Sequence, residues 1–185
     1  MADNYLRLGD KLPDFSLSAF QNNKNTKVVS SSYFGKWLVL VFYPGDFTFV
    51  CPTELVEFSQ NIEIFEKLGA EVLSISIDTA FVHKAWHESS ENLKHISFPM
   101  GSDPTGKICR QIGVFDEEKQ TAMRATYIFD PKGVLRLIEI NDARVGRSVT
   151  EIYRKLVAAK HVSDHPGEVC PASWKPGKPT VKVTK

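Results

Sequence analysis

A cysteine at the start of a predicted helix is the residue of this chain whose surroundings best suit it for chemistry. The stretch PGDFTFVCPTE at 44–54 follows an apolar run at 38–43, which predicts a buried strand, and precedes apolar residues at helical spacing. Cys51 therefore falls in the first turn of a helix, among backbone N–H groups that have no partners within the helix. These donors and the helix dipole favour the nucleophilic thiolate over the thiol. The pattern indicates a reactive cysteine.

The alternative is a structural role, because free cysteine is often buried and packs as a small hydrophobic residue. The neighbours of Cys51 favour chemistry. Thr48 lies three residues before it and can cap the helix or hydrogen-bond the sulfur. The spacing Pro44-x-x-x-Thr48-x-x-Cys51 resembles the active-site motif of the peroxiredoxins, which is highly specific. We therefore interpret Cys51 as catalytic.

A second cysteine lies near the end of the chain, in the stretch HPGEVCP at 165–171, and WKPG follows at 174–177. This segment resembles the resolving-cysteine segment of the typical two-cysteine peroxiredoxins. With both motifs the resemblance covers nearly the whole chain, and it is most similar to the branch of the bacterial alkyl hydroperoxide reductase C proteins, beside the thioredoxin peroxidases. The resemblance implies a modified thioredoxin-type α/β fold and thiol-dependent reduction of hydrogen peroxide and organic hydroperoxides in antioxidant defence.

The resemblance also assigns roles to single positions. Cys51 matches the peroxidatic cysteine, and Cys170 matches the resolving cysteine, which the resemblance implies comes from a second subunit and forms an intersubunit disulfide. The other catalytic positions it implies are Pro44, Thr48 and Arg124, and the supporting positions are Glu54, Trp86 and Arg147. It further implies a homodimer, a ring of five dimers that meet near 79–83, and a reductant that is thioredoxin or a dedicated flavoprotein disulfide reductase. No cofactor and no metal are expected.

Peroxide cleavage explains why these residue types are needed. A thiol with a pKa of about 8.5 is only ~3% ionised at pH 7, so complete ionisation raises the reactive fraction by only ~30-fold. The remaining acceleration must come from stabilising charge on the leaving oxygen, for which Arg124 offers a permanent cation. Thr48 and nearby N–H groups can align the peroxide, and Pro44 would shield the site from water. The resulting Cys51 sulfenic acid must be trapped by a second thiol, and the helix turn must unwind for this.

Alternating segments predict the fold class. The predicted strands are 38–43, 72–77, 125–129 and 134–140, and the predicted helices are 51–65, 80–93, 106–112 and one that begins near Ser148. The turn at 130–133 joins the last two strands as a hairpin. We therefore expect an α/β domain over 1–162, with a central mixed β-sheet flanked by helices. The segment 163–185 is expected to be an extended C-terminal arm, because 171–185 has three prolines, four lysines and no acidic residue. A docking arm and a solvated tail are equally compatible with this composition.

Composition excludes little but is consistent with these expectations. The chain has 185 residues, 42% of them hydrophobic, and a net charge of +1, which gives no argument for nucleic-acid or membrane binding. No apolar run approaches the roughly 20 residues needed to span a bilayer. The first residues show no secretory signal, and three cysteines do not form an even disulfide framework. A reducing cytoplasm is the expected location.

Other residues are weaker candidates. Cys109 is expected to be structural, on a helix and buried. His83 and His87 stand at i, i+4, which is metal-ligand spacing, but no further ligands are evident, so we expect surface or interface histidines. Phe47 and Phe49 suit a core, an interface or a shield of the peroxide site equally well.

Three other functions are weighed against a peroxidase. A disulfide reductase requires Cys-x-x-Cys, but the residue three after Cys51 is Glu54. A metal-binding module requires convergent ligands. A holdase chaperone or scaffold ring could coexist with the peroxidase.

The segment 92–100 contains no glycine and no Tyr-Phe pair follows Cys170. In eukaryotic members a Gly-Gly-Leu-Gly loop and such a pair slow unwinding, so we expect resistance to overoxidation.

Overall fold

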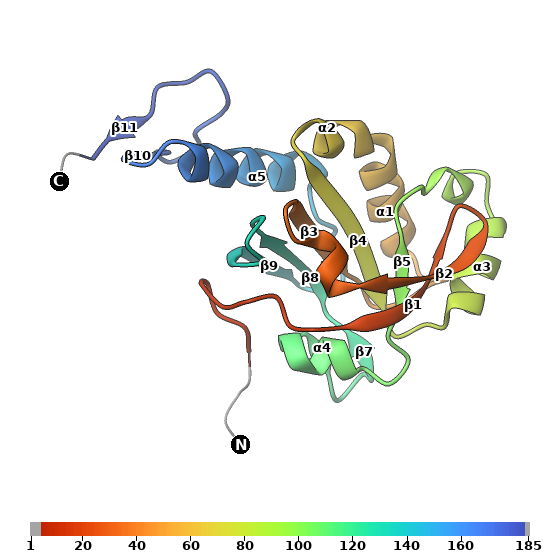
Figure 1. The fold of residues 1–185 in the computed structure, drawn as a ribbon. Helices are drawn as coiled ribbons and strands as arrows, with labels where there is room; N and C mark the ends of the chain where they lie inside the picture. The colour runs from red at the N-terminus through yellow and green to blue at the C-terminus, as the bar shows by residue number, and fades with distance from the viewer. Residues whose placement is uncertain (1–4, 184–185) are drawn as a thin grey trace.

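The computed structural model describes residues 5–183 and has one large mixed sheet at its centre (Figure 1). Its seven strands follow the order β2-β1-β5-β4-β3-β8-β9. Their bounds are β1 (Ser16–Gln21), β2 (Lys24–Val29), β3 (Trp37–Phe42), β4 (Ala70–Ser76), β5 (Met100–Ser102), β8 (Arg124–Phe129) and β9 (Leu135–Asn141). Strand β4 pairs in parallel with β3 and β5, and the other neighbouring pairs are antiparallel. The predicted α/β class with a mixed sheet is confirmed.

Strand β3 lies in the middle of the molecule and leads to the loop before Cys51. All six of its residues are buried, as expected for a continuous apolar run covered on both faces. Successive side chains of a strand point to opposite faces. Leu38, Leu40 and Phe42 accordingly join one hydrophobic cluster, and Val39 and Val41 join the other. The end of this strand is therefore a rigid platform for the loop that follows.

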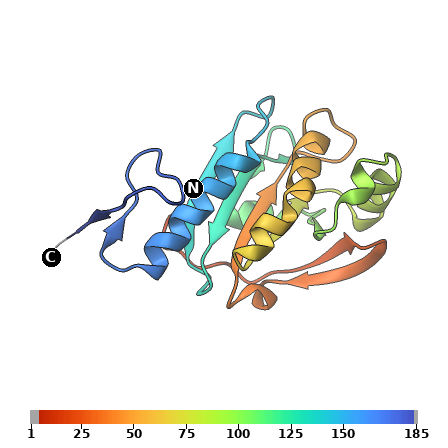
Figure 2. The same ribbon diagram turned by 90° about the horizontal axis from the view of Figure 1, so that it is seen from above.

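Helices cover both faces of the sheet. The helices are α1 (Cys51–Gln60), α2 (Ile62–Lys67), α3 (Ala80–Glu88), α4 (Lys107–Ile112) and α5 (Val149–Asp164), with short 3₁₀ helices at Ser30–Tyr33 and Leu93–His95. Helices α1 and α5 lie over one face and α4 lies over the other (Figures 1 and 2). None of the helices described is long and apolar enough to cross a lipid bilayer.

Two predicted helices are shorter than the spacing suggested. The helix predicted over 51–65 breaks at Asn61, whose side chain donates a hydrogen bond to the carbonyl of Glu57 at 2.8 Å and competes with the helical bonds. The helix predicted over 80–93 ends at Glu88, because the hydroxyl of Ser89 donates to the carbonyl of Trp86 at 2.6 Å. Apolar periodicity continued through both positions, whereas local polar side chains ended the helices.

The hairpin of β1 and β2 at the edge of the sheet was not predicted from the sequence. Its two-residue loop has Asn22 at φ +50° and Asn23 at φ +59°, the conformation of a type I′ turn. Strand β5 was also missed because it has only three residues. A second small pair, β6 (Phe115–Asp116) with β7 (Thr121–Ala122), lies beyond α4.

The C-terminal arm leaves the body of the molecule at the end of α5 (Figures 1 and 2). Helix α5 ends at Asp164, two residues beyond the expected end of the domain. The arm then folds back, because β10 (Glu168–Val169) pairs with β11 (Val181–Lys182). Trp174 between them is 4% exposed, and its carbonyl accepts a bond from Arg154 of α5 at 2.9 Å. The described part of the arm is a docked loop rather than a solvated tail.

Candidate active site

Cys51 is the first residue of α1 and directly follows the loop 43–50. It is 1% exposed and packs in the cluster between the sheet and helices α1 and α5. The N–H groups of Thr53 and Glu54 share the carbonyl of Val50, at 3.1 and 3.4 Å, and Pro52 has no N–H to satisfy. The predicted position of the cysteine in the first helical turn is confirmed.

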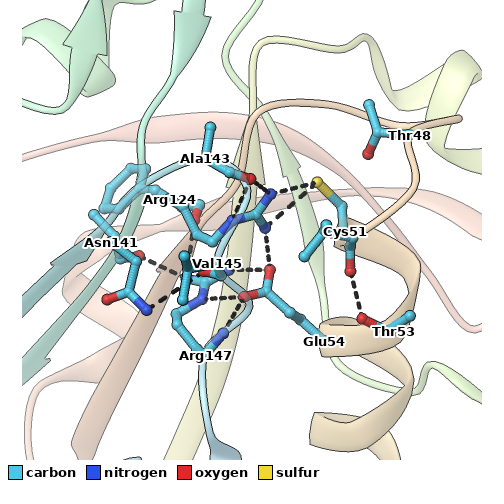
Figure 3. Close-up of polar contacts among 12 residues, drawn as sticks. Thr48, Cys51, Thr53, Glu54, Arg124, Asn141, Ala143, Val145 and Arg147 are labelled. Atoms are coloured by element: carbon cyan, nitrogen blue, oxygen red, sulfur yellow. Dashed lines mark hydrogen bonds and ion pairs between the residues drawn. The ribbon is translucent and has the colours of Figure 1, made fainter.

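Arg124 places a cation against the sulfur (Figure 3). It opens β8, and its Nη1 and Nη2 atoms lie 3.7 and 3.8 Å from the Sγ atom of Cys51. Two further bonds, from Nε at 3.1 Å and from Nη2 at 2.6 Å, go to the carbonyl of Ala143 and fix the plane of the guanidinium. The sulfur therefore faces a buried, fixed positive charge with donors at hydrogen-bonding distance.

Glu54 joins this arginine to a second one (Figure 3). Its Oε2 atom accepts bonds from Arg124 Nη1 and, at 2.8 Å, from Arg147 Nη2. Its Oε1 atom accepts from the backbone N–H of Arg147 at 2.7 Å and from its Nε at 2.9 Å. The remaining nitrogen of Arg147 donates to the carbonyls of Phe42 and Ala125, both at 2.9 Å. The network thus ties α1 to the ends of β3 and β8.

The charges of this network do not cancel. Burial alone would raise the pKa of Glu54, but hydrogen bonds from Arg147, its charge and the charge of Arg124 hold that pKa below its ordinary value. Glu54 is therefore ionised at neutral pH, and one carboxylate faces two guanidinium cations. One positive charge remains, and of the two arginines it is Arg124 that reaches the sulfur. The site is therefore suited to stabilise negative charge that develops on an oxygen bound beside the sulfur.

Thr48 does not make the contacts expected of it. Its hydroxyl donates to the carbonyl of Gly45 at 2.9 Å, and within residues 5–183 no side chain caps the start of α1. The expectation that Thr48 caps the helix or bonds the sulfur is therefore wrong for this state, because the loop turns its hydroxyl back on itself. Pro44 follows β3 and is half-buried. Its shielding role and a contact of Thr48 with peroxide stay predictions.

Trp86 supports the loop from α3. It is buried in the same cluster as Cys51, and its ring stacks on Tyr43 with centroids 6.2 Å apart. Phe47 lies against it at 6.4 Å, while Phe49 is 96% exposed. The two phenylalanines of the motif are thus surface residues of the loop, and neither belongs to the core.

The histidines of α3 are buried, contrary to expectation. His83 is 0% and His87 is 3% exposed. His83 Nδ1 lies 2.7 Å from the carboxylate of Asp46, which also accepts a bond from the hydroxyl of Tyr43 at 2.8 Å. This network was not predicted. The helical spacing of the sequence could have indicated the burial of the two histidines, because both share the buried face of α3 with Ala80.

The other two cysteines lie elsewhere. Cys109 is fully buried on α4, as predicted, and burial together with the charge of Asp103 raises the pKa of its thiol. Cys170 follows β10 on the arm, half-buried, with its Sγ atom 3.8 Å from the carbonyl of Ala158. Within the described residues no group of three or more His, Cys, Asp or Glu side chains is arranged to hold a metal ion.

A buried thiol at a helix start, a facing arginine and a mixed sheet flanked by helices define a thiol-based redox enzyme. Comparison with known proteins gives the family. Residues 8–138 match the model of the AhpC/TSA family, and residues 158–185, which include Cys170, match the C-terminal domain of 1-Cys peroxiredoxin. The chain belongs to the AhpC/TSA family and is a peroxiredoxin, an enzyme that reduces peroxides.

Relatives and solved structures agree with this assignment. The chain is 44% identical over 174 residues to alkyl hydroperoxide reductase C of Salmonella typhimurium, covering 94% of this chain and 93% of the relative. It is 46% identical to the protein of that name from Amphibacillus xylanus, over 95% and 94%. The crystal structure of Enterococcus faecalis AhpC matches with a TM-score of 0.86 and 41% identity, over 89% of this chain and 98% of that one. A reduced 2-Cys peroxiredoxin of Plasmodium vivax matches at 0.89 and 32%, over 94% and 91%.

Proposed function

We propose that Cys51 is the nucleophile of this peroxidase and that Cys170 of a partner subunit resolves it as an intersubunit disulfide. The substrates are hydrogen peroxide and organic hydroperoxides. The observation that carries the proposal is the contact of the Cys51 sulfur with Arg124, in a site that keeps one positive charge in excess.

In the first step the Cys51 thiolate attacks one peroxide oxygen. An S–O bond forms and the O–O bond breaks, so sulfur is oxidised by two electrons and the second oxygen leaves as hydroxide or alkoxide, which takes a proton to give water or an alcohol. Negative charge passes from sulfur to the leaving oxygen during this step. Arg124 touches the sulfur with two nitrogens, and its fixed donors suit both ends of that charge transfer.

In the second step the thiol of Cys170 attacks the sulfenic sulfur of Cys51, an S–S bond forms and water leaves. Within one subunit Cys170 is docked away from Cys51, and we propose that the partner's Cys170 reaches Cys51 instead. Arg147 binds Glu54 beside Cys51 and lies just before the start of α5. Cys170 contacts Ala158, which lies about 14 Å from the start of α5 at a rise of 1.5 Å per residue. A disulfide requires Cα atoms within about 7 Å of each other. Pairing therefore requires the arm to leave its dock and the first turn of α1 to unwind.

The disulfide is then reduced by a dithiol, which we propose is thioredoxin or a dedicated flavoprotein disulfide reductase. The resolving step makes the homodimer the smallest working unit, and a ring of five dimers is the assembly that we propose for it. A reducing compartment such as the cytoplasm, where protein thiols are kept reduced, is the location that we propose. In this scheme residues 1–162 form the peroxidase domain and 163–185 the arm that delivers Cys170.

The test is stopped-flow reaction of the reduced protein with hydrogen peroxide, followed by tryptophan fluorescence, with non-reducing gels of the products. We expect a fast phase that depends on peroxide concentration and a slower phase that does not. Cys51→Ser removes both phases. Cys170→Ser keeps the first phase, removes the second and gives no disulfide-linked dimer.

Cys109→Ala is the matched control, because that thiol is buried away from the site. It keeps both phases and the dimer. A dimer that persists in Cys170→Ser but disappears in Cys109→Ala would show that Cys109 is the resolving residue. A wild-type rate no faster than that of free glutathione would contradict the proposed role of Cys51.

A further inference from the structure

We propose that Asp46, held by His83 and Tyr43, is a positioning residue that clamps the loop before Cys51 in a strained conformation, and that the clamp and the strain together set how readily the first turn of α1 unwinds. This rests on the proposed function, because unwinding matters only if Cys51 must meet a second thiol. Asp46 and His83 do not touch the reacting sulfur. They act through the stretch of loop that joins Asp46 to Cys51.

The clamp joins three parts of the molecule at one residue. Asp46 Oδ1 accepts a bond from the hydroxyl of Tyr43, next to β3, at 2.8 Å, and Oδ2 lies 2.7 Å from Nδ1 of His83 on α3. The backbone N–H of Asp46 donates at 2.9 Å to Asp78, in the turn between β4 and α3. The side chains of Asp46 and His83 are both 0% exposed. Such an anchor cannot be exchanged for water without opening the protein.

The proton count shows that every polar atom of the clamp is used. Nε2 of His83 lies 3.2 Å from the carbonyl of Gly101, which only accepts, so Nε2 carries a hydrogen. One further proton then lies between Nδ1 and the carboxylate of Asp46, on either atom. Burial raises the pKa of Asp46, and the hydrogen bond and charge of His83 oppose that rise. Removing either partner leaves the other buried with an unpaired polar atom.

Strain begins directly after the clamp. Phe47 has φ +54°, a left-handed conformation that is unfavourable for a bulky residue, and the residue is 61% exposed although its ring lies against that of Trp86. From there to Cys51 the loop has little support. Phe49 is 96% exposed, the Thr48 hydroxyl bonds the loop itself, and among the described residues no side chain caps α1.

Two opposed effects follow from this arrangement. The clamp holds the folded turn that keeps Cys51 beside Arg124, whereas the strain at Phe47 favours release of that turn. Breaking the clamp should therefore expose Cys51 more often, and relieving the strain should expose it less often. A general loss of stability would instead speed modification of every buried cysteine, Cys109 included.

The experiment measures exposure of Cys51 directly and does not depend on peroxide. Reduced protein is alkylated with iodoacetamide, and mass spectrometry follows the Cys51 peptide. His83→Gln should speed its modification about ten-fold, as expected for loss of a buried hydrogen bond that leaves its partner unpaired. Tyr43→Phe, which removes one hydroxyl and keeps the ring, should give a smaller increase and serves if His83→Gln does not fold. His87→Gln is the matched control, because His87 shares the buried face of α3 but does not contact Asp46.

The strain is tested at Phe47. Phe47→Asn should slow modification of Cys51 about three- to ten-fold, because asparagine tolerates positive φ better. Phe47→Leu removes the same ring but keeps the strain, and it should match the wild type. With peroxide present, the disulfide phase should speed up in His83→Gln and slow down in Phe47→Asn, and Phe47→Asn should accumulate more Cys51 sulfinic acid.

The outcomes separate the two proposals. Equal alkylation rates in His83→Gln and His87→Gln, or changes of the same sign in His83→Gln and Phe47→Asn, overturn the clamp while the peroxidase assignment stands. Opposite changes in alkylation without any peroxide phase support the clamp and contradict the role proposed for Cys51.

Discussion

Cys51 and Cys170 lie in regions that differ in burial, charge and attachment. Cys51 is almost fully buried and lies against Arg124, which is joined through Glu54 to Arg147 and so to β3 and β8. Cys170 is half-buried on an arm, between the exposed residues Val169 and Pro171. Attack on a peroxide requires a fixed thiol and fixed charge, whereas reaching another subunit requires a thiol that can move. In the proposed mechanism the chain would meet both requirements by placing the two thiols on structures of different stability.

The charges around the two cysteines also differ. Burial and the charge of Glu168 raise the pKa of Cys170, and Arg154 opposes them only in part. Docked on its own α5, Cys170 therefore stays a thiol and is a poor nucleophile. The surroundings of Cys51 retain a net positive charge instead. In the proposed mechanism this difference would direct peroxide to Cys51 and keep Cys170 for the second step.

Removal of the cation beside Cys51 should have the largest effect. We expect Arg124→Ala to slow the peroxide phase about 10²- to 10³-fold, the usual cost of losing a transition-state donor. Arg124→Lys keeps the charge but loses the planar fork that reaches both the sulfur and Ala143, so it should recover only part of the rate. Stopped-flow measurement of both variants decides this. A rate in Arg124→Ala within about three-fold of the wild type would show that the cation is only structural.

Removal of the Glu54 carboxylate, which pairs with both arginines, should have a large effect on stability. Glu54→Gln leaves two buried guanidinium groups without a carboxylate, and we expect a loss of about 3 kcal/mol in the free energy of unfolding, measured with urea. Glu57→Gln is the control, because Glu57 lies on the same helix outside the network. Similar losses in both variants would contradict this account of the charge network.

The same carboxylate predicts a pH dependence. The folded pKa of Glu54 is lowered, so its contribution to stability is present above the unfolded pKa of about 4.3 and is lost as pH falls through the folded value. Wild-type stability should therefore decrease with acidification below about pH 4.3, and the slope should be smaller in Glu54→Gln. Parallel pH profiles for the two proteins would rule this out.

The arm offers the complementary test. Trp174 is the one fully buried residue in the described part of the arm. Its indole donates to the carbonyl of Lys178 at 2.9 Å, and its ring lies 5.1 Å from that of His161. Trp174→Ala should free the arm, so Cys170 should be alkylated about ten-fold faster as local opening becomes easier. The peroxide phase at Cys51 should not change. Val181→Ala, at an exposed position of the same arm, should alter neither rate.

Sequence reasoning predicted the site unevenly, for physical reasons. The strand, the turn and the start of the helix around Cys51 follow from apolar spacing within one short stretch of the chain and were predicted correctly, whereas the end of that helix was not. The bonds of Glu54 to Arg124 and Arg147 span 70 and 93 positions, so no local pattern indicates them, and only the family resemblance suggested these residues. The burial of His83 was predicted wrongly because residue type was given more weight than its place on the apolar face of α3.

Substitution of Cys109, the third cysteine, should have the smallest effect on stability and on the two kinetic phases. Cys109 is fully buried on α4, in the hydrophobic cluster on the face of the sheet opposite α1 and α5. Cys109→Ala should cost about 1 kcal/mol of stability through a small cavity and change both kinetic phases less than about two-fold. Its alkylation in the wild type should require global unfolding and follow the urea transition. If Cys109 were modified in the native state as fast as Cys170, α4 would have to open locally. The comparison of one fixed thiol with one mobile thiol would then have to include Cys109 as a second mobile thiol.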